Sequence, residues 1–303
     1  MARLLMIHAA LLLAALTAVA APAHGAERYE RGSLTERWSQ AQAAAAAAAK
    51  PTWIGWSVDR WADPNGFSFA GGWYFGGSRF ALRGRPLSVR LGAADAQPRP
   101  HAGPPPQSGW ERRPLAILVH VDKSGSIDRV ITTDFQVPVN LREDPLSWLD
   151  RHDPATSITR LANQLETLGI AGSTHLRESV ITAIALHGDP AAFEVLAGIT
   201  RAEPNAELRD AAAEGLPWQH HPRALPLLLE LIAGDPSQDV RRTAVESLGD
   251  LPPAEGLPVL AKIAHTHEDR DLGEEAIETL GDMGRRQPRA REALLRLLAL
   301  HSG

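Results

Sequence analysis

The chain has 303 residues, 44% of them hydrophobic and 22% charged, with a net charge of −5, which is ordinary for a globular protein of one or two domains. No excess of Lys and Arg offers a basic surface to a phosphate backbone, so we expect no nucleic acid partner. The chain contains no cysteine, which excludes disulfides, thiolate nucleophiles and cysteine-based zinc sites.

Residues 1–25 have the features of a secretory signal peptide. A basic start at Arg3 is followed by a long apolar run and by small residues at 23–25. We predict cleavage near Ala26 and a mature periplasmic or secreted protein without stable membrane insertion. The apolar run is also long enough for an uncleaved anchor, although Pro22 and the small residues after it favour cleavage.

Residues 33–50 read "SLTERWSQAQAAAAAAAK" and are typical of a helix. Ser33 and Glu36 form a capping box, alanine is the strongest helix former, and Pro51 stops the helix. We interpret residues 26–50 as an Ala-rich helical segment. It either docks through Trp38 or serves as a spacer.

Residues 51–143 are predicted to form a small β-rich domain with an antiparallel sheet. Its strand candidates are short, aromatic or β-branched, and bounded by turn residues; they are "WIGWSVDRW", "FSFAGGWYFGG", "SRFALRG" and "PLSVRLG". Residues 97–109 form a Pro-rich loop. The aromatic residues favour a packed core. The alternative is a glycan-binding face for cell-wall sugars, built from Trp53, Trp56, Trp73 and Tyr74.

The stretch "ILVHVDKSGS" at residues 117–126 raises a further alternative. Its Asp-x-Ser-x-Ser pattern, beginning at Asp122, resembles the metal site of a von Willebrand factor A domain, where hard oxygens hold a divalent cation. A helix follows the site in that family, whereas the strand-like "IDRVITTDFQVP" follows here. With a turn at Ser124-Gly125, Val119 faces Val130. We therefore expect a hairpin tip.

From residue 144 onward the sequence is predicted to be helical. Capping aspartates stand before prolines at Asp144, Asp153 and Asp189. Apolar residues recur every 32 positions, and N-cap residues recur three positions before them. The apolar set is Leu176, Leu208, Val240 and Leu272; the caps are Ser173, Asn205, Ser237 and Asp269; the first helices align Leu196, Leu228 and Leu260.

Two short helices in each 32-residue unit form a helical hairpin that must stack on a neighbour to bury its apolar face. Residues 144–303 are therefore predicted to form an α-solenoid of about four units and a terminal half-unit. Together with the β domain this gives an α+β fold class.

The second helices contain "LRESVITAIA", "LRDAAAEGL" and "VRRTAVESLG", with an arginine after the apolar position. They resemble the short HEAT-like repeats of the phycobilisome-lyase type. The resemblance implies that second helices line a concave groove, and that arginines tie repeats together except at Gly273, which replaces the arginine. The layout from export signal to repeats also resembles exported bacterial HEAT-repeat proteins of unassigned activity. Bilin attachment is not implied.

Histidines at 220 and 221, and at 265 and 267, have the appearance of metal ligands. In a helical solenoid the first pair lies between repeats and the second pair within one, at opposite edges, so they cannot meet in one chain. We expect these residues and His187 to be solvated loop histidines. The sequence has no catalytic or nucleotide-binding motif, and it predicts neither an enzyme nor a cofactor.

The outward positions of the second helices form a charged ladder that repeats every 32 residues. One row is Glu178, Asp210, Arg242 and Glu274, the other is Thr182, Glu214, Glu246 and Glu278, and Ile181, Val245 and Ile277 lie beside them. One interpretation is a solvated charged face. The other is a groove for a basic, partly apolar segment of a protein or peptide. The second predicts an exported, non-enzymatic binding scaffold.

Overall fold

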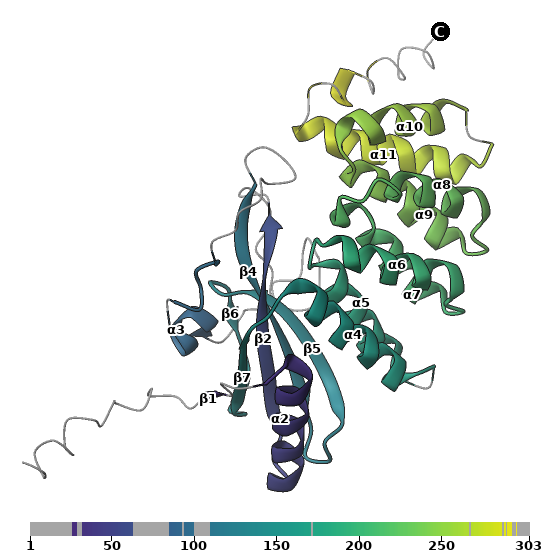
Figure 1. Cartoon of the computed structure of the whole chain (residues 1–303). Helices are drawn as coiled ribbons and strands as arrows, with labels where there is room; N and C mark the ends of the chain where they lie inside the picture. Colours follow the sequence, from purple (N-terminus) through teal and green to yellow (C-terminus); the bar gives the residue numbers. More distant parts are fainter. Residues whose placement is uncertain are drawn as a thin grey trace, which may run out of the picture.

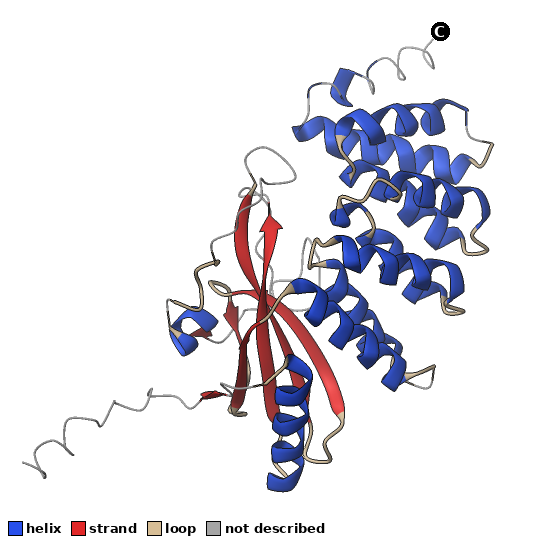
Figure 2. Cartoon of the chain, in the orientation of Figure 1, coloured by secondary structure: helices blue, strands red, loops and turns tan. Residues whose placement is uncertain are grey.

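A β-sheet followed by a stack of helices makes up the described part of the chain (Figures 1 and 2), which confirms the α+β class. This computed structural model describes residues 26–28, 32–62, 85–92, 94–99, 110–170, 172–266, 268–286, 288, 290–292 and 295. The predicted signal segment lies outside them. In these ranges no helix combines the length and the apolar character that a membrane span needs.

The main sheet has five strands in the order β1-β7-β2-β4-β5. They are β1 (Ala26–Arg28), β2 (Thr52–Ala62), β4 (Glu111–Val121), β5 (Ile127–Asp134) and β7 (Leu146–Arg151). β4 is antiparallel to β2 and β5 as predicted, whereas β7 runs parallel to β1 and β2. The sheet is therefore mixed, because the chain returns to its interior after β5 instead of extending its edge.

Strand β7 corrects the predicted domain boundary. Asp144-Pro145 precedes a strand and not a helix, so the helical part begins with α4 (Pro154–Leu168), capped by Asp153. Leu146 and Trp148 are buried in the same apolar cluster on one face of the sheet. The two-residue alternation and strand partners on both sides outweigh the local capping signal.

One predicted strand is a helix. The segment "PLSVRLG" forms α3 (Leu87–Leu91), flanked by a small sheet of β3 (Arg85–Pro86) and β6 (Pro138–Val139). Leu87 and Leu91 pack on the same apolar cluster, and a four-residue spacing on one face fits a helical turn. The segments "FSFAGGWYFGG" and "SRFALRG" and residues 100–109 of the Pro-rich loop lie outside the described residues.

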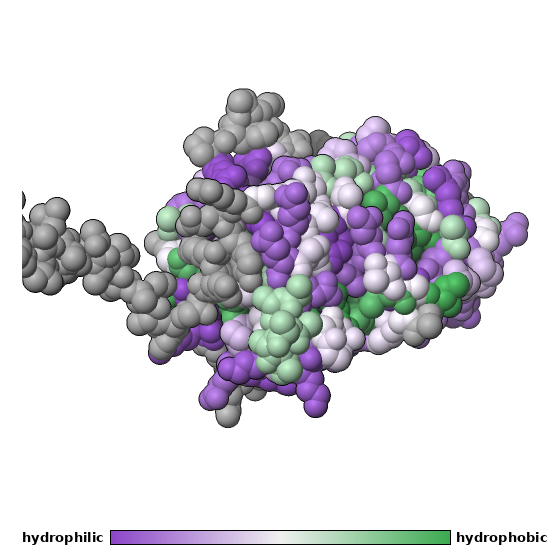
Figure 3. All heavy atoms as spheres, turned by 60° about the horizontal axis from the view of Figure 1, so that its bottom comes forward, coloured by the Kyte–Doolittle hydropathy of each residue, from purple (hydrophilic) through white to green (hydrophobic). Residues whose placement is uncertain are grey.

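Helix α2 (Leu34–Ala48) confirms the predicted capping box. The Glu36 carboxylate accepts a hydrogen bond from the Ser33 backbone N–H at 2.8 Å, and the Ser33 hydroxyl accepts one from the Glu36 N–H. Leu34, Trp38 and Ala41 are buried, so the helix docks through its tryptophan. Its exposed alanines form the pale-green strip in Figure 3.

The β4–β5 hairpin confirms the predicted turn, with Val119 opposite Val130. At its tip the Asp122 carboxylate accepts hydrogen bonds from the backbone N–H groups of Ser124 (2.7 Å) and Ser126 (3.0 Å). Hydrogen bonds from these two serines lower the pKa of Asp122. The tip thus uses its carboxylate for local bonds, and nowhere in the described residues do three His, Asp or Glu gather to hold a metal ion.

The repeats form four helix pairs in the described residues. They are α4 with α5 (Thr174–Ala185), α6 (Pro190–Ala202) with α7 (Ala206–Gly215), α8 (Ala224–Gly234) with α9 (Gln238–Ser247), and α10 (Pro253–Thr266) with α11 (Arg270–Arg286). Short 3-10 turns η1 (Pro217–Gln219) and η2 (Leu248–Asp250) follow α7 and α9. Each predicted cap stands directly before its second helix. Successive second helices contact one another more extensively than first helices do, so the stack curves toward the second helices.

The apolar core runs without a break from the sheet into the repeats. One face of the sheet, including Ile54 and Trp56, packs against α2, α4 and α5, while Trp53 and Trp148 on the other face pack against α3. The terminal units of a solenoid need a cover for their apolar side. The sheet supplies that cover for the first helix pair.

A buried hydrogen-bond chain joins the sheet to the repeats. Trp56 Nε1 donates to Ser157 Oγ at 2.7 Å, and His187 Nε2 lies 2.8 Å from the same oxygen. His187 Nδ1 is 2.7 Å from the Ala183 carbonyl, which can only accept, so Nδ1 carries the proton and Nε2 accepts from Ser157.

The prediction that His187 is solvated is wrong, because the residue is 1% exposed. The tight turn at Gly188, which has a φ of 57°, directs the ring inward. Burial lowers the pKa of His187 to about 4. The imidazole is therefore neutral at neutral pH.

Arginines tie each repeat to the next. Each belongs to a second helix and contacts an acidic residue in the turn between the two helices of the following repeat. The pairs are Arg177–Glu203 at 2.6 Å, Arg209–Asp235 at 2.8 Å and Arg241–Asp269 at 3.7 Å. These are the ties that the sequence resemblance implies.

Candidate protein-binding face

Acidic side chains from three successive second helices gather around Glu214. The pKa of Glu214 is raised to about 7. Burial is the largest cause, and the carboxylates of Asp210, Glu246, Asp250 and Glu178 contribute the rest. Because α5, α7 and α9 lie side by side (Figure 1), these residues share one side of the stack. We refer to Glu178, Asp210, Glu214, Glu246 and Asp250 as the acidic face.

Two neighbours of Glu214, Asp210 and Glu246, also have raised pKa values. Burial raises the pKa of Asp210, against a hydrogen bond from Thr243, and Asp210 Oδ1 is buried without a hydrogen-bond partner among the described residues. Burial also raises the pKa of Glu246, and the carboxylates of Glu275 and Asp250 add to the shift. Burial and neighbouring carboxylates therefore disfavour the ionised form of the side chains in the acidic face.

Cations compensate only one end of the predicted ladder. Arg242 binds Glu275 at 2.7 Å, and Arg270 binds Glu274 at 2.7 Å. In the part of the chain that the structure describes, no Lys or Arg forms an ion pair with Glu214 or Glu246. Glu278 is exposed on α11 near Arg242.

Sequence reasoning missed Asp250, Asp282 and Glu275. Asp250 and Asp282 are 32 residues apart and follow Glu246 and Glu278 by one helical turn, so the repeat itself could have found them. Glu275 has no acidic counterpart one repeat earlier, where Thr243 stands. Only the packing of α9 on α11 shows its place.

The apolar residues predicted beside the ladder need correction. Ile181 is 1% exposed and Val245 is fully buried, so neither can meet a partner. Both are part of the core that joins neighbouring helices, because the position before the outward residue turns toward the next repeat. Ile277 is partly buried.

Glu214→Gln should stabilise the protein above neutral pH. The folded-state pKa of about 7 lies above the unfolded value, so the folded form binds the extra proton and stability falls as pH rises through this window. We expect the free energy of unfolding of the variant to exceed that of the wild type by about 2 kcal/mol at about pH 8, allowing for partial solvent access. This difference should vanish below about pH 4. Urea unfolding across pH measures this, and a pH-independent difference would contradict it.

Trp53 and Trp56 confirm the favoured interpretation, a packed core, over the glycan-binding alternative. Trp53 and Trp56 are each 1% exposed, and their indole N–H groups donate to the Leu141 carbonyl and to Ser157. Aromatic rings that are closed on both sides cannot stack on a sugar. Trp73 and Tyr74 lie outside the described residues.

His220 and His221 also differ from the solvated state predicted for them. The His220 ring lies 4.6 Å from the Trp110 ring, and the His221 ring stacks on Phe193 at 4.0 Å. Burial lowers the pKa of His220. His265 is exposed, as predicted, and His267 lies outside the described residues.

The repeats match a known family. Its profile, described as HEAT repeats, covers residues 158–248 and 225–302. No curated protein matches the chain. Among solved structures that match is the complex of CpcE and CpcF of phycocyanin lyase from Nostoc sp. PCC7120, with 21% identity, 41% of this chain and 87% of that chain covered, and a TM-score of 0.32. That similarity carries no functional argument. The helical part of this chain is a solenoid of HEAT-like repeats.

Proposed function

We propose that the protein is an exported, non-enzymatic scaffold that binds a partner protein through the acidic face. The partner segment is basic. Export rests on the predicted signal peptide at residues 1–25. The scaffold role is supported by the HEAT-like repeats, because stacked helical repeats present extended binding surfaces.

The observation that carries this proposal is the cluster of carboxylates from three second helices around Glu214, which together with burial raises its pKa. A solvated charged face keeps its carboxylates apart and fully hydrated, whereas here burial and mutual repulsion raise the pKa of Glu214 to about 7. A Lys or Arg from a partner would relieve that repulsion and favour ionisation. Binding should therefore release protons, strengthen as pH rises toward about 8, and weaken with salt.

Charge reversal at Glu214 and Glu246 tests the proposal. A photo-crosslinking residue at the exposed Glu246, placed in the native host, first captures the partner. We then expect Glu214→Lys with Glu246→Lys to weaken binding of that partner by at least about tenfold, while the melting temperature stays at or above that of the wild type because the repulsion among the carboxylates is relieved. The binding is measured with purified proteins at two salt concentrations.

The matched control is Glu166→Lys with Glu255→Lys, which makes the same change in net charge on exposed positions of the first helices α4 and α10. It should leave binding intact. Equal losses from both pairs would reduce the effect to net charge, and no loss from either would contradict the proposed face.

A further inference from the structure

Carboxylates at equivalent positions form a row across three neighbouring second helices. Glu214, Glu246 and Glu278 follow one another at the 32-residue interval on α7, α9 and α11. Helix α9 packs against both α7 and α11 (Figure 1), and the axes of packed helices lie about 8 to 10 Å apart. Equivalent positions are displaced by one such step. A ligand that contacts successive carboxylates of this row therefore needs cations at that spacing.

The first two carboxylates of the row are the ones without a cation. In the described ranges no Lys or Arg forms an ion pair with Glu214 or Glu246, whereas Glu278 lies near Arg242. Glu246 is exposed and Glu214 is partly exposed. Both can therefore accept hydrogen bonds from a cation outside the chain.

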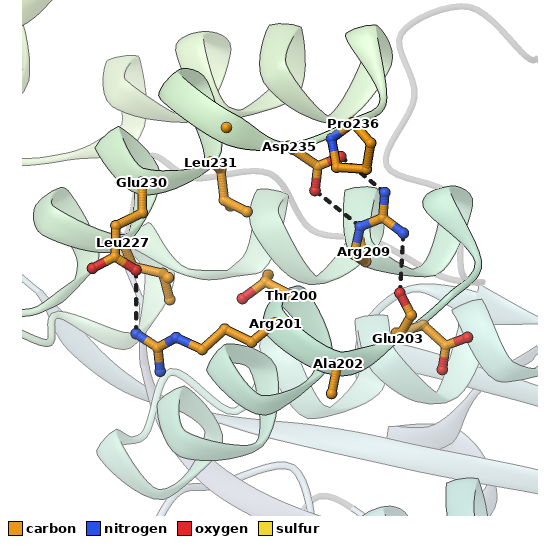
Figure 4. A pocket seen from close by; sticks show the side chains of 11 residues that line it. Thr200, Arg201, Ala202, Glu203, Arg209, Leu227, Glu230, Leu231, Asp235 and Pro236 are labelled. Atoms are coloured by element: carbon orange, nitrogen blue, oxygen red, sulfur yellow. Dashed lines mark hydrogen bonds and ion pairs between the residues drawn. The ribbon is translucent and has the colours of Figure 1, made fainter.

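The side of the stack formed by the first helices differs in this respect. A cleft of about 380 Å³ lies there between α6 and α8, and Figure 4 shows the ion pairs along it. Arg209 binds Asp235 at 2.8 Å, and Arg201 lies 3.5 Å from Glu230. The charges of this cleft are paired within the chain, so it offers a basic segment less than the row on the second helices does.

The backbone conformation of a bound segment follows from the spacing of the row. In a polyproline II helix every third residue returns to the same face about 9 Å further along, which matches the distance between packed helices. A β-strand places residues of one face about 7 or 13 Å apart. It would also need a sheet edge for its backbone hydrogen bonds, and the backbone groups of the second helices are bonded within each helix.

An α-helical segment meets the spacing but not the surface. Residues seven positions apart on a helix are separated by about 10.5 Å, yet a partner helix binds by laying an apolar stripe into an apolar groove. Val245, which precedes Glu246, is fully buried, and Ile277, which precedes Glu278, is partly buried. A polyproline II segment keeps its backbone solvated and can therefore lie on a polar helical face.

We propose, on the basis of the function proposed above, that the partner segment is a polyproline II stretch with Lys or Arg at every third residue. It lies across α7 and α9 toward α11, so that successive cations meet Glu214 and Glu246. The residues between the cations face away from the helices and are free to vary.

Three peptides of identical composition and charge test the spacing on the full chain. They are acetyl-Lys-Pro-Pro-Lys-Pro-Pro-Lys-Pro-Pro-amide, acetyl-Lys-Pro-Lys-Pro-Lys-Pro-Pro-Pro-Pro-amide and acetyl-Lys-Lys-Lys-Pro-Pro-Pro-Pro-Pro-Pro-amide. Calorimetric titration is done at low salt and about pH 8, above the pKa of about 7 of Glu214. We expect the first peptide to bind at least about tenfold more tightly than the other two, because only its lysines share one face.

A matched pair of variants localises the effect. Glu246→Gln should abolish the advantage of the first peptide, whereas Glu255→Gln, at an exposed position of α10, removes the same charge and should preserve it. An advantage that survives in Glu246→Gln would place the peptide elsewhere and refute the assignment.

The same titration keeps this proposal separate from the function on which it rests. Equal binding of the three peptides, or binding of none, would overturn the spacing and the conformation. The acidic face itself would stand or fall by the charge-reversal variants with the captured partner, a result that does not depend on any of these peptides.

Discussion

Trp56→Ala should lower the free energy of unfolding by about 3 to 5 kcal/mol and loosen the first helix pair as well as the sheet. Trp56 is 1% exposed and packs edge-on against Trp38, with ring centroids 5.9 Å apart. The substitution opens a cavity where β2, α2 and α4 meet. It also removes the donor to Ser157, which leaves the chain to His187 incomplete.

Hydrogen exchange of the α4 and α5 amides measures this coupling. The control is Trp53→Ala, which deletes an equally buried ring on the opposite face of the sheet. It should destabilise the sheet while leaving local protection in α4 and α5 close to normal. If Trp56→Ala left those amides as protected as the control does, the sheet could not be the cover of the first repeat.

Arg209→Met should lower the free energy of unfolding by about 3 to 5 kcal/mol, because it strands a buried carboxylate. The side chains of Arg209 and Asp235 are 9% and 3% exposed, and the arginine makes two bonds to the carboxylate. Methionine replaces the aliphatic part of the arginine side chain and removes every donor. The interface between the second and third repeats should therefore weaken.

Arg241→Met provides the comparison for Arg209→Met. Its partner Asp269 lies 3.7 Å away, and the two side chains are 27% and 32% exposed, so solvent already screens the pair. We expect a loss below about 1 kcal/mol. Urea unfolding of the two variants gives the difference, and equal losses would mean that burial does not set the strength of these ties.

The repeats were predictable because their signal is local and repeated. A 32-residue interval in apolar and capping residues fixes helix pairs without any knowledge of tertiary contacts. Strand β7 was not predictable from the sequence, because Asp144-Pro145 has the local features of a helix start. Its strand character comes from pairing with β1 on one side and β2 on the other, and such partners are distant in the sequence.

The acidic face was likewise predictable only in part. Its carboxylates could be placed from periodicity, because outward positions on equivalent helices recur with the repeat. The burial of Ile181 and Val245 could not, because a helix in a stack has neighbours on two sides and one residue of rotation separates an open position from a closed one. His187 likewise reads as a loop residue in the sequence, whereas in the structure its ring is buried and bonded to Ser157 and to the Ala183 carbonyl.

Each arginine tie runs from one repeat to the next repeat along the chain, and this direction decides where repeats could be added to the array. Each repeat supplies the arginine and its successor supplies the acid, so a duplicated unit inserted in register would bring both halves of its own connection. The beginning of the array has no such freedom, because Trp56, Ser157 and His187 join one particular strand to one particular helix pair. At the far end Gly273 offers no arginine to a successor. Lengthening by duplication is thus open in the middle of the array and closed at the sheet.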